Sequence, residues 1–235
     1  YAVWQRQTMQ GATLAKLLTY WKKRLEGSPA VLNLPMAQPR PRLKSYRGSS
    51  IQIDLPPELY AKAKNFARIH RATTFMTLLT VFKTLIYRYT GQTDILIASG
   101  FANRQRRELE SMIGMIVNTV MLRTDLSGDP SFIQALERVR ETVLEAASYQ
   151  DLPFEKLVEV LQPKRDLSYN PIYQVVFSFH DSPIPELDLP KLHGSLVYRQ
   201  NQSAKFDLNV VVIPREAQLL GLGNNGSDER VIMVW

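Results

Sequence analysis

The chain has 235 residues, a length that suits one large domain or two small ones. Hydrophobic residues make up 45% of it, enough for a buried core and too many for a disordered chain. Lysine and arginine exceed aspartate and glutamate by 29 − 22 = 7, and the chain has no cysteine, which excludes disulfides, thiolate metal sites and a cysteine nucleophile and predicts a cytoplasmic protein.

The sequence predicts neither a membrane segment nor a nucleic-acid surface. The longest apolar run, 75–89, carries Lys83 and Arg88 and has helical period, so it predicts a core helix. The chain opens without a signal peptide, and without an initiator Met it is expected to begin inside something longer. Its basic residues are scattered rather than gathered in a stripe, which predicts an ordinary basic surface and no nucleic acid or membrane partner.

Predicted helices and strands alternate along the chain, which favours an α/β sandwich. Residues 11–27 place apolar side chains on one helical face, with Gly27 where a glycine cap belongs. Residues 28–48 hold four prolines and mixed basic residues and predict an extended linker. The remaining predicted elements are a strand at 49–55, helices at 56–70 and 73–91, strands at 93–101 and 112–126, a helix at 129–150, a short helix from Pro153, and strands at 171–180, 194–201 and 205–213. The 112–126 run is apolar on both faces and predicts a central buried strand.

Residues with catalytic chemistry are few. The three histidines, His70, His180 and His193, lack the spacing of a metal site, so no bound metal is expected. His70 falls at a predicted helix C-terminus, where a cap is its expected role. The sequence contains no nucleophile elbow, phosphate-binding loop or dinucleotide fingerprint.

Two polar groups stand inside apolar runs. Asn118 and Thr119 interrupt the 112–126 run, so the buried amide is either satisfied by neighbours or points into a cavity. Strand alternation in 171–180 places Gln174, Ser178 and His180 on one face, opposite a face of apolar and aromatic residues. That pattern indicates either a half-exposed sheet or a strand that lines a solvent channel.

A dense polar cluster at 150–171 predicts an ordered corner. Pro153 is suited to start a helix, and Asp151 or Glu155 is placed to satisfy free N–H groups in the first turn of that helix. Arg165 and Asp166 are close enough to fix the following turn by charge-assisted hydrogen bonds. The cluster is either such a structural corner, which would hold the strand that begins at Pro171, or the lining of a site.

Taken together, these segments resemble the C-terminal half of a condensation domain of nonribosomal peptide synthetases. "YAVWQ" is similar to the end of a Tyr-x-Asp-aromatic-Ala-Val-Trp motif, and "IGMIVNTVMLR" to an Ile-Gly-x-aromatic-Val-Asn-Thr…Arg motif. "YQDLPFEKLV" resembles a His-Gln-Asp-x-Pro-Phe-Glu motif, and "RDLSYNPIYQVVF" an Arg-Asp-x-Ser-x-Asn-Pro motif. "RYTGQTDILIASGFANR" and "KFDL" also fit the family pattern, and the match runs from residue 1 to about Pro214. The motif residues are Trp4, Gly114, Arg123, Gln150, Asp151, Pro153, Phe154, Glu155, Arg165, Asp166, Asn170, Pro171 and Asp207.

The resemblance implies a fold and a reaction. The fold is an α/β lobe of the chloramphenicol acetyltransferase type, one of two in a V with a tunnel between them. Residues 1–10 are then the tail of the N-terminal lobe, 11–48 a helix with a proline- and arginine-rich linker, and 49–235 the C-terminal lobe. Donor and acceptor carrier proteins present thioesters on phosphopantetheine arms, and the acceptor amine attacks the donor thioester. Implied partners also include an N-terminal lobe and an adjacent adenylation domain, with Asn118, Thr119, Gln174 and Ser178 as the tunnel-lining candidates.

The chain departs from the family in three places. The His-His-x-x-x-Asp-Gly motif of the N-terminal lobe is absent, so no catalytic residue is assigned in this chain and the isolated chain is expected to be inactive. Tyr149 stands where the family has His. The tail after about Pro214 does not follow the family, which leaves the last sheet strand in doubt.

Two other readings remain open beside the peptide-bond-forming half domain. One is a non-catalytic scaffold or docking fragment, and the other is a lobe of a related acyl-CoA acyltransferase. Carrier proteins are expected to be acidic, which makes the basic loop residues Arg104, Arg106 and Arg107 the docking candidates, with an ordinary solvated charge run as the alternative.

Overall fold

The computed structural model describes residues 1–29, 31–164, 166–182, 201–215 and 231–234. The helices are α1 (Ala2–Thr8), α2 (Gly11–Leu25), α3 (Pro57–Ile69), α4 (Thr74–Thr90), α5 (Arg107–Glu110), α6 (Phe132–Ser148) and α7 (Phe154–Leu161). The strands are β1 (Gln52–Leu55), β2 (Asp94–Phe101), β3 (Asn118–Asp125), β4 (Val175–Phe179), β5 (Leu208–Pro214) and β6 (Val231–Val234). The α/β class predicted from the sequence is confirmed.

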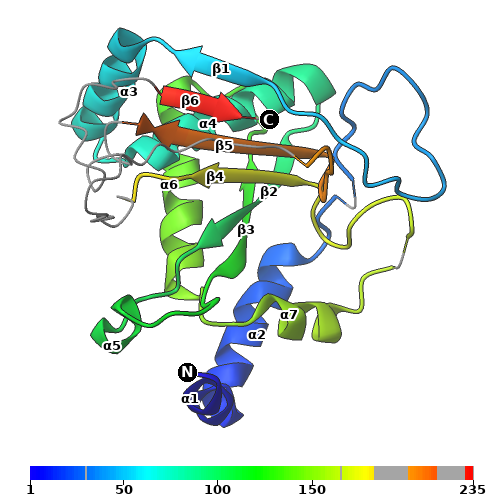
Figure 1. Cartoon of the computed structure of the whole chain (residues 1–235), viewed down its shortest axis with the longest axis vertical. Helices are drawn as coiled ribbons and strands as arrows, with labels where there is room; N and C mark the ends of the chain where they lie inside the picture. The colour runs from blue at the N-terminus through cyan, green and yellow to red at the C-terminus, as the bar shows by residue number, and fades with distance from the viewer. Residues whose placement is uncertain (30, 165, 183–200, 216–230, 235) are drawn as a thin grey trace, which may run out of the picture.

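The strands form one mixed sheet in the order β1-β6-β5-β4-β2-β3 (Figure 1). Strands β2, β4 and β5 run parallel, whereas β3 pairs with β2 and β6 pairs with β5 and β1 in the antiparallel sense. Since β2 and β4 are parallel, their carboxyl ends lie at the same side of the sheet. Strand β3 starts at that side, because Asn118 pairs with Phe101.

Residues close in sequence cap the ends of the long helices. The Thr73 hydroxyl accepts the Met76 N–H at 3.1 Å at the start of α4, and Gly91 ends that helix with φ +68°. Ser131 and Gln134 exchange hydrogen bonds of 3.3 and 2.8 Å at the start of α6. Each of these caps is made by residues that lie within one helical turn of each other in the sequence.

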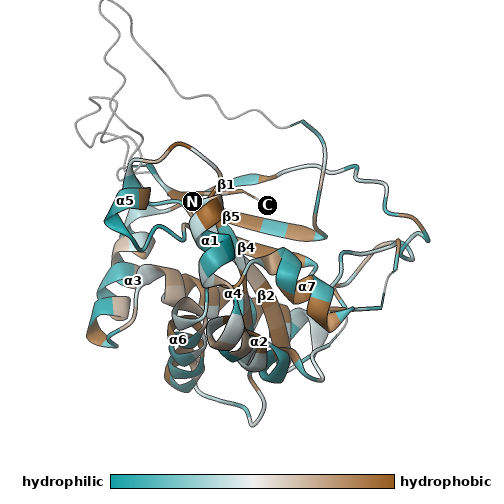
Figure 2. Ribbon diagram, turned by 90° about the horizontal axis from the view of Figure 1, so that it is seen from below, coloured by the Kyte–Doolittle hydropathy of each residue, from teal (hydrophilic) through white to brown (hydrophobic). Residues whose placement is uncertain are grey.

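The core lies between the sheet and its helices. Helices α4 and α6 pack together against β2 and β3, and α3 packs on α4 (Figures 1 and 2). The rings of Phe82 and Phe177 stack with centroids 5.5 Å apart and join α4 to β4. Helix α2 lies along the outer edge of β3 and buries Trp21, whose indole N–H donates to the Tyr149 carbonyl at 2.9 Å.

The side chain of Lys83 lies fully inside this core. Lys83 of α4 has no exposed surface, and its amine donates to the Ile95 carbonyl at 3.2 Å, the Leu122 carbonyl at 2.6 Å and the Thr124 hydroxyl at 2.9 Å. Burial lowers the pKa of Lys83 well below that of a free lysine. The side chain ties the helix layer to the paired strands β2 and β3.

The predicted central strand at 112–126 is wrong in two respects. The strand begins only at Asn118, and β3 forms an edge of the sheet. Apolar residues on both faces of a strand indicate that other elements cover both faces of the sheet there. They do not indicate that the strand has a hydrogen-bonded neighbour on each edge. The free edge is covered instead by α2, whose Arg24 donates to the Arg123 carbonyl at 2.7 Å.

The end of the chain also differs from expectation. The doubted last strand is present as β6, which is inserted between β1 and β5 through pairs such as Gln52 with Val234 and Ile213 with Ile232. The predicted strand at 194–201 lies almost wholly outside the described residues. Two helices, α1 and α5, occur where the sequence analysis expected a lobe tail and a polar loop.

Candidate functional site

Asn118 joins two motifs that lie more than thirty residues apart. Its side-chain amide donates to the carbonyls of Gln150 and Leu152, each at 2.6 Å. Its side-chain oxygen accepts the N–H of Phe154 at 3.2 Å and that of Thr119 at 3.0 Å. With 9% of its surface exposed, Asn118 has every hydrogen-bonding position occupied. The structure thus favours the first of the two alternatives, a buried amide satisfied by neighbours.

The start of α7 is capped differently from the sequence expectation. Pro153 is the N-cap residue, as predicted, and makes no side-chain cap hydrogen bond. The free N–H of Phe154 is taken by Asn118 rather than by Asp151 or Glu155. The expectation that Asp151 or Glu155 caps this N–H is therefore wrong, because the Asn118 side chain from β3 accepts its hydrogen bond.

The other tunnel-lining candidates lie at different depths. Gln174 is buried with 3% exposure and donates to the Asn170 carbonyl at 3.4 Å. Thr119 and Ser178 are half-buried, as the alternation of β4 predicts for Ser178. Burial raises the pKa of the nearby Tyr173, and a hydrogen bond with the Thr119 side chain opposes that shift.

A second junction fastens the linker to the sheet. Arg40 forms a two-pronged ion pair with Asp207, in which one contact is 3.0 Å, and also donates to the Ser168 carbonyl at 3.2 Å. Lys44 donates to the Asn170 side-chain oxygen at 3.1 Å. The sequence analysis missed Arg40 and Lys44, although their positive charges between prolines are the natural complement of Asp207.

The predicted corner at 165–171 is held by fewer contacts than the sequence suggests. Arg165 lies outside the described residues. Asp166 accepts the N–H and hydroxyl of Ser168 at 2.7 and 2.6 Å, and these bonds lower the pKa of its carboxyl. Pro171 is exposed just ahead of β4. The turn is thus fixed by an Asp–Ser contact.

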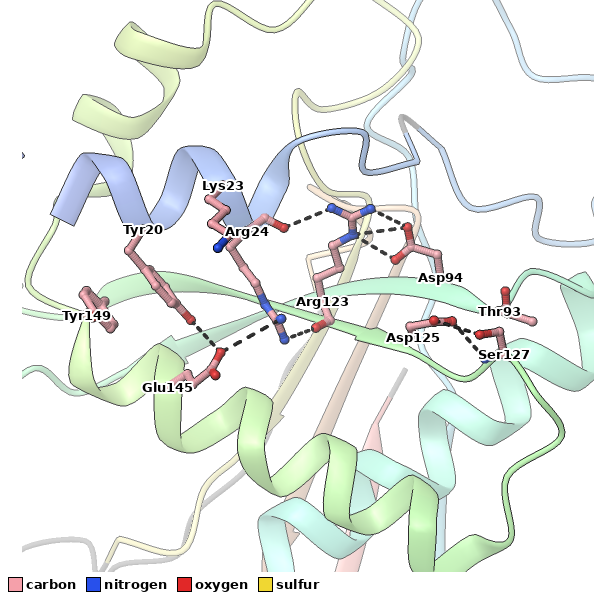
Figure 3. A pocket seen from close by; sticks show the side chains of 10 residues that line it. All are labelled: Tyr20, Lys23, Arg24, Thr93, Asp94, Arg123, Asp125, Ser127, Glu145 and Tyr149. Atoms are coloured by element: carbon pink, nitrogen blue, oxygen red, sulfur yellow. Dashed lines mark hydrogen bonds and ion pairs between the residues drawn. The ribbon is translucent and has the colours of Figure 1, made fainter. Parts of the chain in front are cut away.

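The outer edge of β3 borders a charged pocket of about 810 Å³ (Figure 3). Arg123 binds Asp94 through two nitrogens at 2.9 and 2.7 Å and donates to the Arg24 carbonyl at 3.0 Å. Burial, and then Glu145, raise the pKa of Tyr20 to about 12. Most charged groups in this pocket are already paired, so it fastens α2 to the sheet.

Tyr149, at the position where the family has His, is part of the same fastening. Its ring stacks on Tyr20 with centroids 3.8 Å apart and an interplanar angle of 4°. Its carbonyl accepts the Trp21 indole N–H. Tyr149 therefore packs against α2.

The three arginines proposed for docking have separate environments. Arg104 turns inward and donates to the carbonyls of Leu109, Met112 and Gly114, with distances of 2.9 and 3.3 Å to the last two. The guanidinium of Arg106 lies over the Trp4 ring, 4.3 Å from its centroid. Arg107 is exposed at the start of α5. Of the three, only Arg107 is exposed without making, to the residues that the structure describes, a hydrogen bond or ring contact of the kind that Arg104 and Arg106 make.

An exposed apolar strip precedes β3. Ile113 and Met115 have exposures of 101% and 94%, and Val117 has 60%. Within 112–117 only Ile116 is buried, and the segment lies at the side of the sheet where β2 ends and β3 begins. Contiguous apolar surface of this kind marks an interaction site in soluble proteins.

The described residues hold no recognisable catalytic group. His70 is the C-cap residue of α3, His180 follows β4, and His193 lies outside the described ranges. Among the residues that the structure places, no group of three histidines, cysteines or acids could hold a metal ion. None of the helices placed in the structure is long and apolar enough to cross a membrane.

Comparison with known proteins decides the family, because the family model of the condensation domain matches residues 1–220. The chain belongs to the condensation domain family. Its fold is accordingly of the chloramphenicol acetyltransferase type, as predicted.

Several relatives and structures are similar to this condensation-domain chain. A linear gramicidin synthase of Brevibacillus parabrevis is 44% identical over 230 residues, which are 97% of this chain and 3% of that protein. A dimodular nonribosomal peptide synthase of Bacillus subtilis is 39% identical over 217 residues, 90% of this chain and 9% of that protein. The X-domain from teicoplanin biosynthesis has a TM-score of 0.85 at 27% identity, and the match covers 100% of this chain and 53% of that structure. The chain thus spans about half of that condensation-fold structure and a small part of the synthetases.

Proposed function

We propose that this chain is part of a condensation domain that forms peptide bonds between carrier-bound thioesters in nonribosomal peptide synthesis. The observation that carries the proposal is the match of the condensation family model over residues 1–220. The acceptor amine attacks the donor thioester carbonyl, a C–N bond forms, and the C–S bond breaks. The thiol of the donor phosphopantetheine leaves with a proton that the amine gives up.

An upstream half domain supplies the catalytic histidines in this proposal. The exposed strip of Ile113, Met115 and Val117 is the docking surface for that half, since it follows the loop and short helix that contact α1 through Arg106 and Trp4. The Tyr1 hydroxyl accepts a hydrogen bond from the Asn103 side chain at 3.1 Å, which holds this helix against the loop after β2. The tunnel between the halves then borders the strip.

The residues of this chain act by positioning. Thr119 and Ser178 are the half-buried candidates for the tunnel wall, and the buried Asn118 and Gln174 support that wall from inside. Holding two reactants in reactive geometry lowers the barrier by roughly 7–11 kcal/mol. Rigid junctions such as the Asn118 hydrogen bonds are what such positioning requires.

Carrier proteins and an adenylation domain are the proposed partners, in the cytoplasm. The phosphopantetheine arm is attached to the carrier protein, so this chain is not expected to bind it as a cofactor of its own. Exposed Arg107 is the described arginine best placed to attract an acidic carrier surface.

The test is a single-turnover assay with donor and acceptor carriers loaded with aminoacyl thioesters. We expect dipeptidyl transfer when the chain is joined to its upstream half and none from the 235-residue chain alone. Transfer by the isolated chain above the buffer rate would show that its own residues suffice and would overturn the division of labour proposed here.

A second candidate function is docking of another protein without catalysis. It is favoured by the likeness to the teicoplanin X-domain in its complex with OxyB, which has a TM-score of 0.83 at 27% identity. Absence of transfer in the joined form, together with binding of a separate protein partner, would favour this alternative.

A further inference from the structure

A cavity of about 900 Å³ lies between the helix layer and the sheet, outside the junctions described above. Its walls come from α3, from the start of α4, from α6 and from the carboxyl ends of β2 and β4. The crevice at the carboxyl ends of parallel strands is the place where open α/β sheets bind ligands. The volume falls within the range of small-molecule sites.

The interior of this cavity is mostly apolar and partly aromatic, with hydroxyl groups at Thr73 and Ser99. Phe75, Phe101 and Phe179 line it and are each half-buried, so part of each ring faces the open space. The rings of Phe75 and Phe101 stand nearly perpendicular, at 82°, with centroids 6.4 Å apart. Small residues, Ala67 and Ala147, leave the room that the cavity occupies. An aromatic guest would find edge and face contacts here.

Charged residues are confined to the helix and loop that rim the cavity. Lys64 and Arg68 come from the exposed side of α3, and Asp181 follows β4. A charged guest side chain would therefore lose its hydration in the apolar interior without an ionic partner there, whereas an uncharged aromatic or long aliphatic one would not.

The cavity adjoins the strip on which the upstream half is proposed to dock. Gly100 lines the cavity, and a Cβ atom placed on it would stand 3.5 Å from Val117, a strip residue. The same edge of β2 thus separates the cavity from the strip. A substrate in the tunnel that borders the strip has the cavity beside it.

We propose that this cavity receives a large uncharged aromatic or aliphatic side chain of one of the two aminoacyl thioesters, and so selects the substrate. The inference rests on the proposed function. The side chain belongs either to the donor or to the acceptor, and the experiment separates these two sources.

The first arm measures selectivity in the full-length protein that contains this chain. Both carriers are loaded in every reaction: phenylalanyl replaces glycyl first on the donor, with a glycyl acceptor, and then on the acceptor, with a glycyl donor. Ala147→Phe fills the cavity from α6, and we expect kcat/KM for one phenylalanyl partner to fall about tenfold while that for glycyl stays within about twofold. Ala61→Phe, on an exposed position of α3 that does not line the cavity, is the matched control. An equal effect on phenylalanyl and glycyl substrates at both positions would overturn the proposal.

The second arm needs no catalysis. N-acetyl-L-phenylalaninamide is titrated into the isotope-labelled chain and followed by NMR, with N-acetylglycinamide as the matched probe. We expect shifts of the Phe101 and Phe179 amide signals with the first probe, and none in Ala147→Phe. If Ala147→Phe unfolds, Leu144→Trp narrows the same cavity from an exposed position. No shift with the phenylalanine probe in the unchanged chain would overturn the cavity assignment, whereas shifts without any condensation would overturn only the proposed reaction.

Discussion

The side-chain oxygen of Asn118 accepts the backbone N–H of Phe154 at 3.2 Å, so the first residue of β3 caps helix α7 across 36 positions of sequence. The same side chain donates to two carbonyls of the segment that leads into α7. Two sequence motifs are thereby one structural unit, and the orientation of α7 depends on β3.

Replacing Asn118 by alanine is expected to destabilise the fold. The change leaves two buried carbonyls and one helix N–H without their partner, each of which costs on the order of 1–3 kcal/mol. The midpoint of urea unfolding should therefore fall. The control is Asn65→Ala, because Asn65 is exposed on α3 and bonds only locally to Arg68 at 3.0 Å. An Asn118→Ala protein as stable as the control would mean that water replaces these bonds.

The Arg40–Asp207 pair should show a measurable coupling energy. The two side chains are 19% and 17% exposed, so the pair is partly shielded from solvent. A double-mutant cycle with Arg40→Ala and Asp207→Ala is expected to give a coupling of about 0.5–3 kcal/mol in urea unfolding. The matched cycle on Lys156 and Glu159, a pair 55% and 66% exposed, should give less than about 1 kcal/mol. Equal couplings in the two cycles would contradict a fastening role for the linker pair.

Because of Lys83, the free energy of unfolding is expected to vary with pH above neutrality. Because burial lowers its pKa in the folded chain, the unfolded chain binds more protons at pH values between the lowered pKa and about 10.4. The free energy of unfolding should then rise with pH in that window. Unfolding at about pH 7, 8 and 9 measures the slope.

Lys83→Met is the control for that slope. It keeps the volume of the side chain and removes the titrating amine, so the slope attributable to Lys83 should vanish. The change also removes the donor to the Ile95 and Leu122 carbonyls and the Thr124 hydroxyl, so overall stability is expected to fall, and the slope rather than the stability is the readout. A slope that is identical in both proteins would show that Lys83 stays protonated when the chain folds.

Arg107 and Arg106 should differ when each is reversed to glutamate in the full-length protein. Arg107→Glu is expected to slow association with an acidic carrier at low salt, with the effect lost near 1 M salt, where the Debye length is about 3 Å. Arg106→Glu also removes the contact with Trp4, so it should lower the melting temperature as well. Stopped-flow association rates at two salt concentrations provide the measurement. Unchanged rates for Arg107→Glu at low ionic strength would rule out docking through this loop.

What the sequence determined by itself was the local structure and the family. The caps of α4 at Thr73 and Gly91 act within one helical turn, and the pattern of apolar residues located the helices and most strands. Motif order was enough to indicate a condensation-domain fold, because each motif is readable without knowing its neighbours in space.

Only the tertiary structure decided where the polar motif residues point. Asn118 could have faced a cavity, and three of its four partners lie 32 to 36 residues away. Arg40 reaches Asp207 across 167 positions, and β3 became an edge strand although its residues are apolar on both faces. Sequence periodicity records which side chains are buried, whereas hydrogen-bond partners and strand order depend on which distant segments pack together, and no local pattern encodes that choice.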